Sequence, residues 1–139
     1  MRSKRPTIND LNMLGVHFYS VGAYELAIVQ LEQAVSLAPE VASIHFNLGG
    51  AYYGTGRVAD AEREFRQALA LDPEHVRGHW FRGLCLEGLG DLDAALGEFG
   101  WVLRHSTGSR EARSAREEIE VIGSLLQPRN AGEDSRVSP

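Results

Sequence analysis

The strongest constraint on the fold is a stretch of sequence that returns after 34 residues. LEQAVSLAPE at 31–40 aligns with FRQALALDPE at 65–74 at this shift. At the same shift, MLGVHFYSVG at 13–22 aligns with NLGGAYYGTG at 47–56 and with FRGLCLEGLG at 81–90. Three copies in register, without a gap, predict an array of similar structural units that stack on one another.

Each copy has the pattern of two helices. Apolar residues recur at helical spacing, and in the first copy they are Leu11, Leu14, Phe18, Ala27, Leu31 and Ala34. Gly22, Gly56 and Gly90 follow the first helical segment of each copy, where a C-cap glycine belongs. Pro39 and Pro73 follow the second segment, and proline cannot continue a helix. Each copy is therefore predicted to be an antiparallel helix pair.

Over about residues 8–107, this pattern resembles the tetratricopeptide repeat, W-x2-L-G-x2-Y, then A-x3-F, then P. The second copy carries His45, Leu48, Gly49, Tyr52, Ala61, Phe65, Ala68 and Pro73, and departs only at His45. The third copy is the weakest match, with His79, Arg82, Gly83, Leu86, Ala95, Phe99, Val102 and Thr107. The resemblance implies an all-α, right-handed solenoid of three antiparallel helix pairs, at 8–41, 42–75 and 76–107.

The ends of the chain differ from the repeats. After Ser109, a plausible N-cap, residues 109–126 predict a capping helix that covers the last pair. Its apolar residues, which share one face, are Ala112, Ala115, Ile119, Ile122 and Leu126. Residues 127–139 have almost no apolar content and are predicted to be a disordered tail. Residues 1–7 are predicted to be a flexible N-terminal tail.

Glycine also recurs inside the first helix of each copy, at a cost of about 1 kcal/mol relative to alanine. The three positions are Gly15, Gly49 and Gly83. Recurrence at one phase indicates a packing role, in which the bare Cα lets the second helix approach. The small counterparts that we expect on that helix are Ala27, Ala61 and Ala95.

Composition excludes several classes of protein. The chain has 139 residues and a net charge of −5, which argues against nucleic acid as the main partner. It has no apolar run of about 18 residues and no apolar segment after MRSKRP, so neither membrane insertion nor a secretory signal is expected. The single cysteine, Cys85, excludes an internal disulfide and fits a reducing compartment. A cytoplasmic location is therefore expected.

Catalysis, a cofactor and a metal site are not expected. The sequence has no Walker A loop, no G-x-S-x-G and no H-E-x-x-H. His45 and His79 occupy one position in successive copies, but no carboxylate or thiol lies at ligand spacing, so packing is the favoured interpretation. Cys85 lies among apolar residues, which favours a buried, inert thiol. Arg82 replaces an apolar residue and is expected to reach solvent or a carboxylate.

In the resembled family, the first helices line a concave surface that binds peptides. The matching positions carry four aromatic residues, Tyr19, Phe46, Tyr53 and Trp80, where a solvated face prefers charges. We therefore expect a groove for an apolar or amphipathic segment of a partner protein. Its predicted residues are Asn12, Val16, Tyr19, Phe46, Asn47, Gly50, Tyr53, Arg77, Trp80 and Leu84. The alternative is that some of the rings turn inward and fill the space between repeats.

Some co-chaperone members of the family hold carboxylates in a clamp of Lys, Asn and Arg side chains. The matching positions here are Asn12, Val16, Asn47, Arg77 and Phe81. Only Asn47 matches outright and Arg77 keeps the charge, so a carboxylate clamp is not expected.

The favoured function is therefore a protein-interaction adaptor. One alternative is a scaffold that self-assembles into a homo-oligomer through a flat patch of Gly97, Gly100 and Trp101, or through the C-terminal helix with Leu125 and Leu126. Another interpretation of Gly97 and Gly100 is that they admit the capping helix closely. A third function, a secretion-type chaperone for a client protein, shares the groove with the adaptor.

Overall fold

The computed structural model describes residues 4–127, which form seven α-helices and no strand. The helices are α1 (Ile8–Ser20), α2 (Tyr24–Leu37), α3 (Ala42–Gly54), α4 (Val58–Leu71), α5 (Val76–Gly88), α6 (Leu92–His105) and α7 (Arg110–Leu126). Residues 1–3 and 128–139, which hold most of the predicted disordered tail and part of the N-terminal one, lie outside the described residues. Residues 4–7 are exposed and precede α1.

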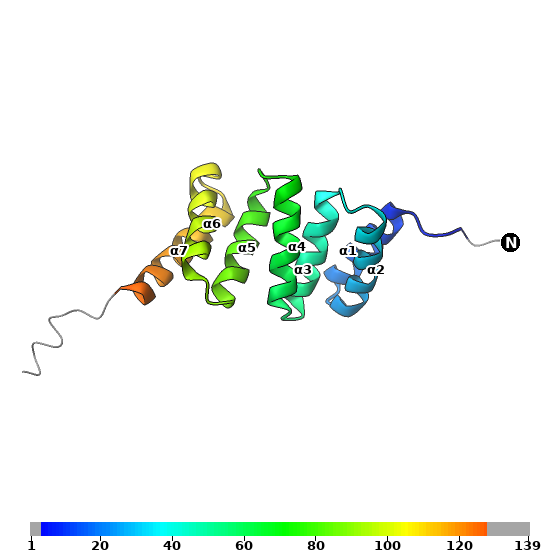
Figure 1. Cartoon of the computed structure of the whole chain (residues 1–139), viewed down its shortest axis with the longest axis horizontal. Helices are drawn as coiled ribbons and strands as arrows, with labels where there is room; N and C mark the ends of the chain where they lie inside the picture. The colour runs from blue at the N-terminus through cyan, green and yellow to red at the C-terminus, as the bar shows by residue number, and fades with distance from the viewer. Residues whose placement is uncertain (1–3, 128–139) are drawn as a thin grey trace, which may run out of the picture.

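The helix pairs follow one another along an elongated row, with α1 and α2 at one end and α6 and α7 at the other (Figure 1). Each helix packs on the next, from α1 on α2 to α6 on α7. The first helices of the pairs also contact one another, α1 with α3, and α5 contacts α7. An array of helices in which each unit contacts only its neighbours is a helical solenoid. The prediction of an all-α solenoid is therefore confirmed.

The helices begin and end at the capping residues that the sequence predicts. Gly22, Gly56 and Gly90 have φ of 78°, 80° and 84°, a left-handed conformation that favours glycine. The Ser109 hydroxyl accepts a hydrogen bond from the Ala112 backbone N–H at 2.9 Å and caps α7.

The core lies between the helices in two clusters. The first joins the first two pairs and includes Ala27, Leu31, Ala61 and Phe65, none of which is exposed. The second joins α5, α6 and α7, and its buried residues are Leu86, Ala95, Phe99, Val102, Ala112, Ala115 and Ile122. Three residues of α7 thus complete the second cluster, as expected of a capping helix.

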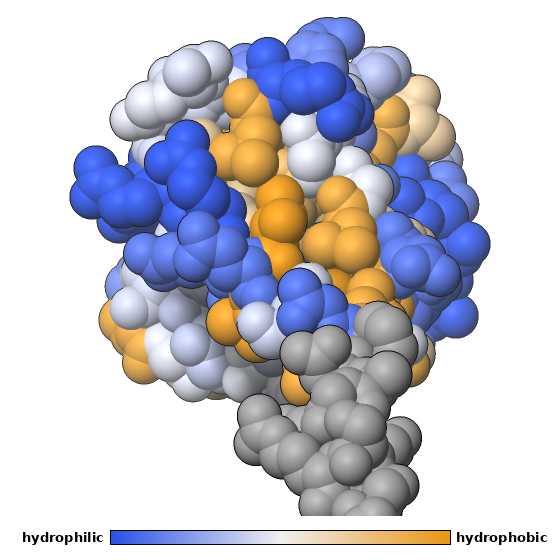
Figure 2. Space-filling view, turned by 90° about the vertical axis from the view of Figure 1, so that its left-hand side faces the viewer, coloured by the Kyte–Doolittle hydropathy of each residue, from blue (hydrophilic) through white to orange (hydrophobic). Residues whose placement is uncertain are grey.

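The capping helix α7 itself has exposed apolar residues. Val121, Leu125 and Leu126 of α7 are exposed. Figure 2, which views the row from the end near α6 and α7, shows an apolar band between hydrophilic flanks. No helix among the described residues combines the length and the apolar character that a membrane crossing needs.

The glycines inside the first helices serve the close helix packing that was predicted for them. A Cβ on Gly15 would lie 2.5 Å from Leu31 Cγ, and one on Gly49 would lie 2.8 Å from Phe65 Cε1. On Gly83 it would lie 2.6 Å from Phe99 Cε1. A large side chain of the second helix therefore lies directly over each glycine, and the small counterparts Ala27, Ala61 and Ala95 are fully buried on the same helices.

The expectation that Gly97 and Gly100 admit the capping helix is wrong. A Cβ on Gly97 would meet nothing within 4 Å, and one on Gly100 would meet only Arg104 Nη1, at 3.2 Å. The reason is helix phase, because α7 packs on the Phe99 and Val102 side of α6. Trp101 lies against histidine, with ring centroids 3.7 Å from His79 and 4.1 Å from His105.

The two unusual histidines tie their own helix pairs together. His45 lies 2.7 Å from a Glu64 carboxylate oxygen and 2.7 Å from the Pro39 carbonyl oxygen. His79 makes the same two contacts in the next pair, with Glu98 at 2.6 Å and the Pro73 carbonyl at 2.7 Å. The packing interpretation is therefore confirmed, with hydrogen bonds added.

The other two polar expectations also hold. The Arg82 guanidinium donates to Glu62 at 3.1 Å and to Glu98 at 2.7 Å, so it finds two carboxylates. Cys85 is fully buried, and its burial raises the pKa of the thiol to about 12. Such a thiol is protonated and inert at neutral pH.

Candidate functional site on the first-helix face

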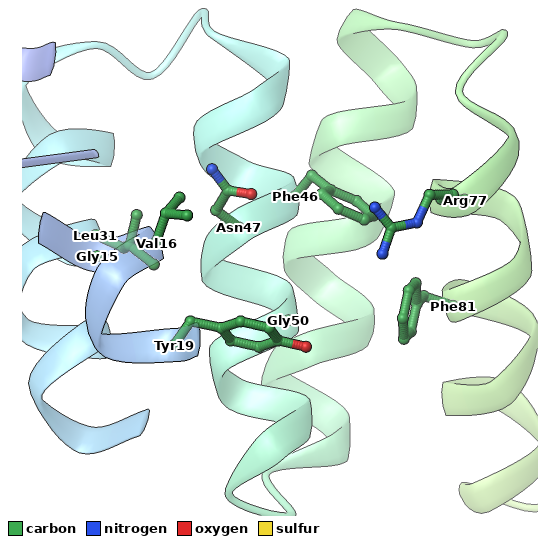
Figure 3. Close-up of a pocket in the computed structure, with 9 residues that line it drawn as sticks. All are labelled: Gly15, Val16, Tyr19, Leu31, Phe46, Asn47, Gly50, Arg77 and Phe81. Atoms are coloured by element: carbon green, nitrogen blue, oxygen red, sulfur yellow. The ribbon is translucent and has the colours of Figure 1, made fainter. Parts of the chain in front are cut away.

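The face of the row that is formed by α1, α3 and α5, here called the first-helix face, contains a hollow of about 190 Å³ (Figure 3). This first hollow is lined by Gly15, Val16, Tyr19, Leu31, Phe46, Asn47, Gly50, Arg77 and Phe81. Six of these were predicted as groove residues from the sequence: Val16, Tyr19, Phe46, Asn47, Gly50 and Arg77. The repeat period brings them together because it places equivalent helix faces side by side.

Gly50 keeps the hollow open. A Cβ on Gly50 would meet Tyr19 of α1, whereas one on the adjacent Gly49 would meet Phe65 of α4. The Tyr19 ring of α1 extends toward it (Figure 3). A Cβ on Gly50 would lie 3.4 Å from Tyr19 Cε2, so any larger side chain would fill the space between α1 and α3.

An aromatic cluster centred on Phe81 forms the other wall. Its ring centroid lies 5.5 Å from that of Phe65, 5.9 Å from Phe46 and Tyr53, and 5.0 Å from Trp80. Phe46 is partly buried, because it lines the hollow and also lies 5.6 Å from Phe65 in the core. Both interpretations of the rings are therefore partly right: the cluster joins core and groove.

The sequence analysis did not assign Phe81 to the groove wall. It considered Phe81 only as a position of the carboxylate clamp. The available signal was that Phe81 follows Asn47 by one repeat period, and Asn47 had been placed at the edge of the groove.

Two polar groups border the first hollow. Asn47 donates a hydrogen bond to Asn12 at 2.9 Å, which joins α3 to α1. The Arg77 guanidinium lies over the rings of Phe46, at 5.4 Å, and Phe81, at 5.8 Å. Arg77 is the one cationic side chain in the lining that the structure describes.

A second hollow of about 160 Å³ adjoins the first. It is lined by Arg77, Trp80, Phe81, Arg110, Glu111 and Ser114, from α5 and α7. Arg77 and Phe81 line both hollows, which together are called the groove below. Trp80 is partly buried, and its indole Nε1 is buried with no hydrogen-bond partner among the described residues.

Three predicted groove residues, Asn12, Tyr53 and Leu84, line neither hollow. Asn12 accepts the hydrogen bond from Asn47 described above. Tyr53 is partly buried and contacts the aromatic cluster through Phe81. Leu84 packs against the second core cluster.

Two carboxylates lie close to Tyr53. Burial, then the charge of Glu118 and a hydrogen bond between the two carboxyl groups, raise the pKa of Glu87. Burial raises the pKa of Tyr53 most, and the nearby thiol of Cys85 and the charges of Glu87 and Glu118 raise it further. Glu87 comes from α5 and Glu118 from α7, so α3, α5 and α7 meet here.

Comparison with protein families decides the identity of the repeats. A model described as "TPR repeat" matches residues 15–56, and a model described as "Tetratricopeptide repeat" matches residues 51–100. The chain belongs to the tetratricopeptide repeat family. The His45 and His79 departures are therefore variations within a tetratricopeptide fold. Among curated proteins, none matches the sequence.

Solved structures agree with this fold. The first tetratricopeptide domain of Spaghetti (RPAP3), bound to an HSP90 peptide, is 24% identical with a TM-score of 0.79, over 86% of this chain and 92% of that one. The second such domain of human RPAP3, with an HSP70 peptide, is 24% identical with a TM-score of 0.74, over 82% and 98%. The Yersinia enterocolitica secretion chaperone SycD, with a peptide of the translocator YopD, is 18% identical with a TM-score of 0.80, over 89% and 98%.

Proposed function

We propose that this chain is a protein-interaction adaptor whose groove binds an apolar segment of another protein. The observation that carries the proposal is the first hollow, where Val16, Tyr19, Phe46 and Phe81 surround the bare Cα of Gly50. Aromatic walls that meet in a small pocket are typical of sites that hold one anchoring side chain. A cytoplasmic location is part of the proposal, on the ground of the free Cys85 thiol.

The size of the hollow favours a peptide over a small molecule. Sites for drug-sized ligands and cofactors enclose roughly 300–1,000 Å³ and bury most of the ligand. The two hollows measure about 190 Å³ and 160 Å³ and open side by side. Two small adjacent pockets suit successive side chains of one extended or helical segment.

The similar structures support a protein ligand but not its chemistry. The RPAP3 domains bind peptides of HSP90 and HSP70, and SycD binds a YopD peptide. Here the positions that would supply further clamp groups hold Val16 and Phe81, and the Asn12 amide is already bonded to Asn47. We therefore propose apolar burial, in place of carboxylate capture, as the main source of affinity.

The decisive variant is Gly50→Leu, which places a side chain in the first hollow. Its matched control is Gly97→Leu, because Gly97 also lies in a helix and a Cβ there meets nothing. Both exchanges replace a helical glycine, so both should keep or raise the melting temperature. In selections from a displayed library of random dodecapeptides, we expect wild type and Gly97→Leu to enrich the same apolar motif and Gly50→Leu to enrich none. Equal enrichment by Gly50→Leu would reject the groove as the binding site.

A chaperone for a secreted client would use the same groove, and the SycD similarity favours it as a second candidate. Co-expression separates this function from that of an adaptor, because a chaperone keeps its otherwise insoluble client in solution. A self-assembling scaffold rests instead on the exposed Val121, Leu125 and Leu126 of α7. Light scattering after gel filtration tests it, and a monomer at tens of micromolar would remove it.

A further inference from the structure

Large apolar side chains that are exposed gather at the two ends of the row. Outside the groove, the first helix pair exposes Met13, Leu14, Val21, Leu26, Val29 and Leu37, and α7 exposes Val121, Leu125 and Leu126. In the described stretch between them, residues 42–109, only Leu71 and Leu89 are exposed. A solenoid that ends as a single copy has polar outer faces on its terminal units, and neither end of this row is of that kind.

The repeat period shows which side of α1 is uncovered. Leu14 occupies the position of Leu48 and Arg82 in the next two copies. Arg82 of α5 donates to Glu62 of α4, so this position faces the preceding helix pair. Leu48 faces it too, because it is 2% exposed in the core cluster that includes Ile28 of α2. Leu14 is 42% exposed, since no helix in the described chain covers it as α2 covers Leu48.

Two leucines of α2 lie at the same end of the row. Ile28 occupies the position of Glu62, which contacts the following pair, so Ile28 faces α3. Leu26 and Leu37 are two residues before and nine residues after Ile28, and at about 100° per residue both point to the opposite side of α2. Both are more than half exposed. Leu14, Leu26 and Leu37 are here called the N-end face, which belongs to the pair at one end of the row in Figure 1.

Charge distinguishes this end from α7. After Arg5, no Lys or Arg occurs before Arg57. The carboxylates of that stretch are all exposed, and they are Asp10, Glu25, Glu32 and Glu40. The exposed charged residues of α7 are Arg110, Arg113, Arg116, Glu117 and Glu120. The ion pairs of the described chain use other arginines, so those of α7 are available to the carboxylates of another molecule.

This inference goes beyond the proposed function, because it concerns the ends of the row and not the groove. We propose that copies of this chain associate head to tail, with α7 of one copy packed on the N-end face of the next. The exposed apolar residues of α7 and of the N-end face then cover each other, with the α7 arginines near the carboxylates of the first pair. A contact between two different surfaces leaves one free end on each side, so the row of copies grows beyond a dimer.

A second copy in this orientation fits better than either surface paired with itself. Two N-end faces in contact bring the four carboxylates of one copy toward those of the other, and two α7 helices do the same with three arginines. Like charges across an interface oppose association, whereas opposite charges favour it. A helix is also what covers the equivalent of Leu14 inside the chain, where α2 packs on α3.

The test is sedimentation velocity of the full chain from tens to hundreds of micromolar. The mass of the wild type should rise with concentration, through the dimer to longer rows. Leu14→Glu places a carboxylate on the N-end face, and Leu125→Glu places one on α7. Each variant alone should stay monomeric. An equal mixture should form a heterodimer and nothing larger, because it contains one intact surface of each kind.

The matched control is Leu71→Glu, because Leu71 is exposed on α4 at the position of Leu37. It should assemble like the wild type. Leu26→Glu replaces Leu14→Glu if the melting temperature of the latter falls. A monomeric wild type, a dimer formed by either Glu variant alone or a mixture that stays monomeric would overturn the inference. None of these results bears on the groove, which the Gly50→Leu selection tests separately.

Discussion

Two regions of the molecule use the same residue types in opposite ways. One is the interior, which lies between the packed helices, and the other is the first-helix face. In the interior, a ring or leucine covers each helical glycine, and the carboxylates pair with Arg82 or a histidine. On the first-helix face, Gly50 opens a hollow, and Trp80 Nε1 and Glu87 Oε2 have no partner among the described residues. The interior is complete by itself, whereas the first-helix face keeps an open groove in which we propose that another molecule binds.

Two phenylalanines in mutual contact test this contrast with the largest expected effect. Phe65 is fully buried, whereas Phe46 is partly buried and lines the first hollow. Phe65→Ala should lower the free energy of unfolding by about 3–5 kcal/mol, a large fraction of a domain's stability. Phe46→Ala should cost clearly less and should abolish peptide binding. Urea denaturation of both variants measures the difference, and equal losses would show that Phe46 is only a core residue.

Two adjacent glycines sharpen the contrast at smaller energies. A Cβ on Gly49 would lie 2.8–3.0 Å from three atoms of the immobile Phe65 ring, so Gly49→Ala should destabilise by about 1–3 kcal/mol. Gly50→Ala meets only the 40% exposed Tyr19, which can shift, so the helix should gain up to about 1 kcal/mol. Opposite changes in melting temperature are expected. A loss of stability in Gly50→Ala would mean that this position is packed.

The smallest expected effect is the contribution of His79 to the pH dependence of stability. Burial alone would lower the pKa of His79, but its hydrogen bonds to Glu98 and the Pro73 carbonyl and the charge of Glu98 outweigh burial and raise it above 6.5. The folded state therefore binds the proton more tightly than the unfolded chain. This contribution is complete below pH 6.5 and is lost as the pH rises through the folded-state pKa.

The measurement is the melting temperature at pH 6 and pH 8, for wild type and His79→Phe. The wild type should lose more stability over this range than the variant, which lacks the titrating group. The same pH dependence in both proteins would mean that the Glu98 contact does not favour the protonated ring.

The sequence was most informative where the physics is local and repeated. The period, the glycines after the first helices and the Ser109 cap predicted the helix pairs, because caps and apolar spacing act within a few residues. It was less informative about side-chain direction. The contact of Phe65 with Gly49 was not predicted, and Gly97 faces away from α7, since both outcomes depend on helix rotation.

The candidate site divides in the same way. Gly50 and Phe46 followed from repeat positions that face one side of the row. The role of Phe81 as a groove wall and the approach of Glu118 to Glu87 did not, because they depend on how α5 meets α3 and α7 across the repeats. A single sequence offers no signal for such contacts, since they belong to the assembled face.

The most direct test of the groove is a nuclear magnetic resonance structure of the protein with a selected peptide. Intermolecular contacts should join the methyl groups of the apolar anchor to Val16, Phe46 and Phe81. Contacts confined to the opposite side of the row, around Trp101 and His105, would contradict a binding site on the first-helix face.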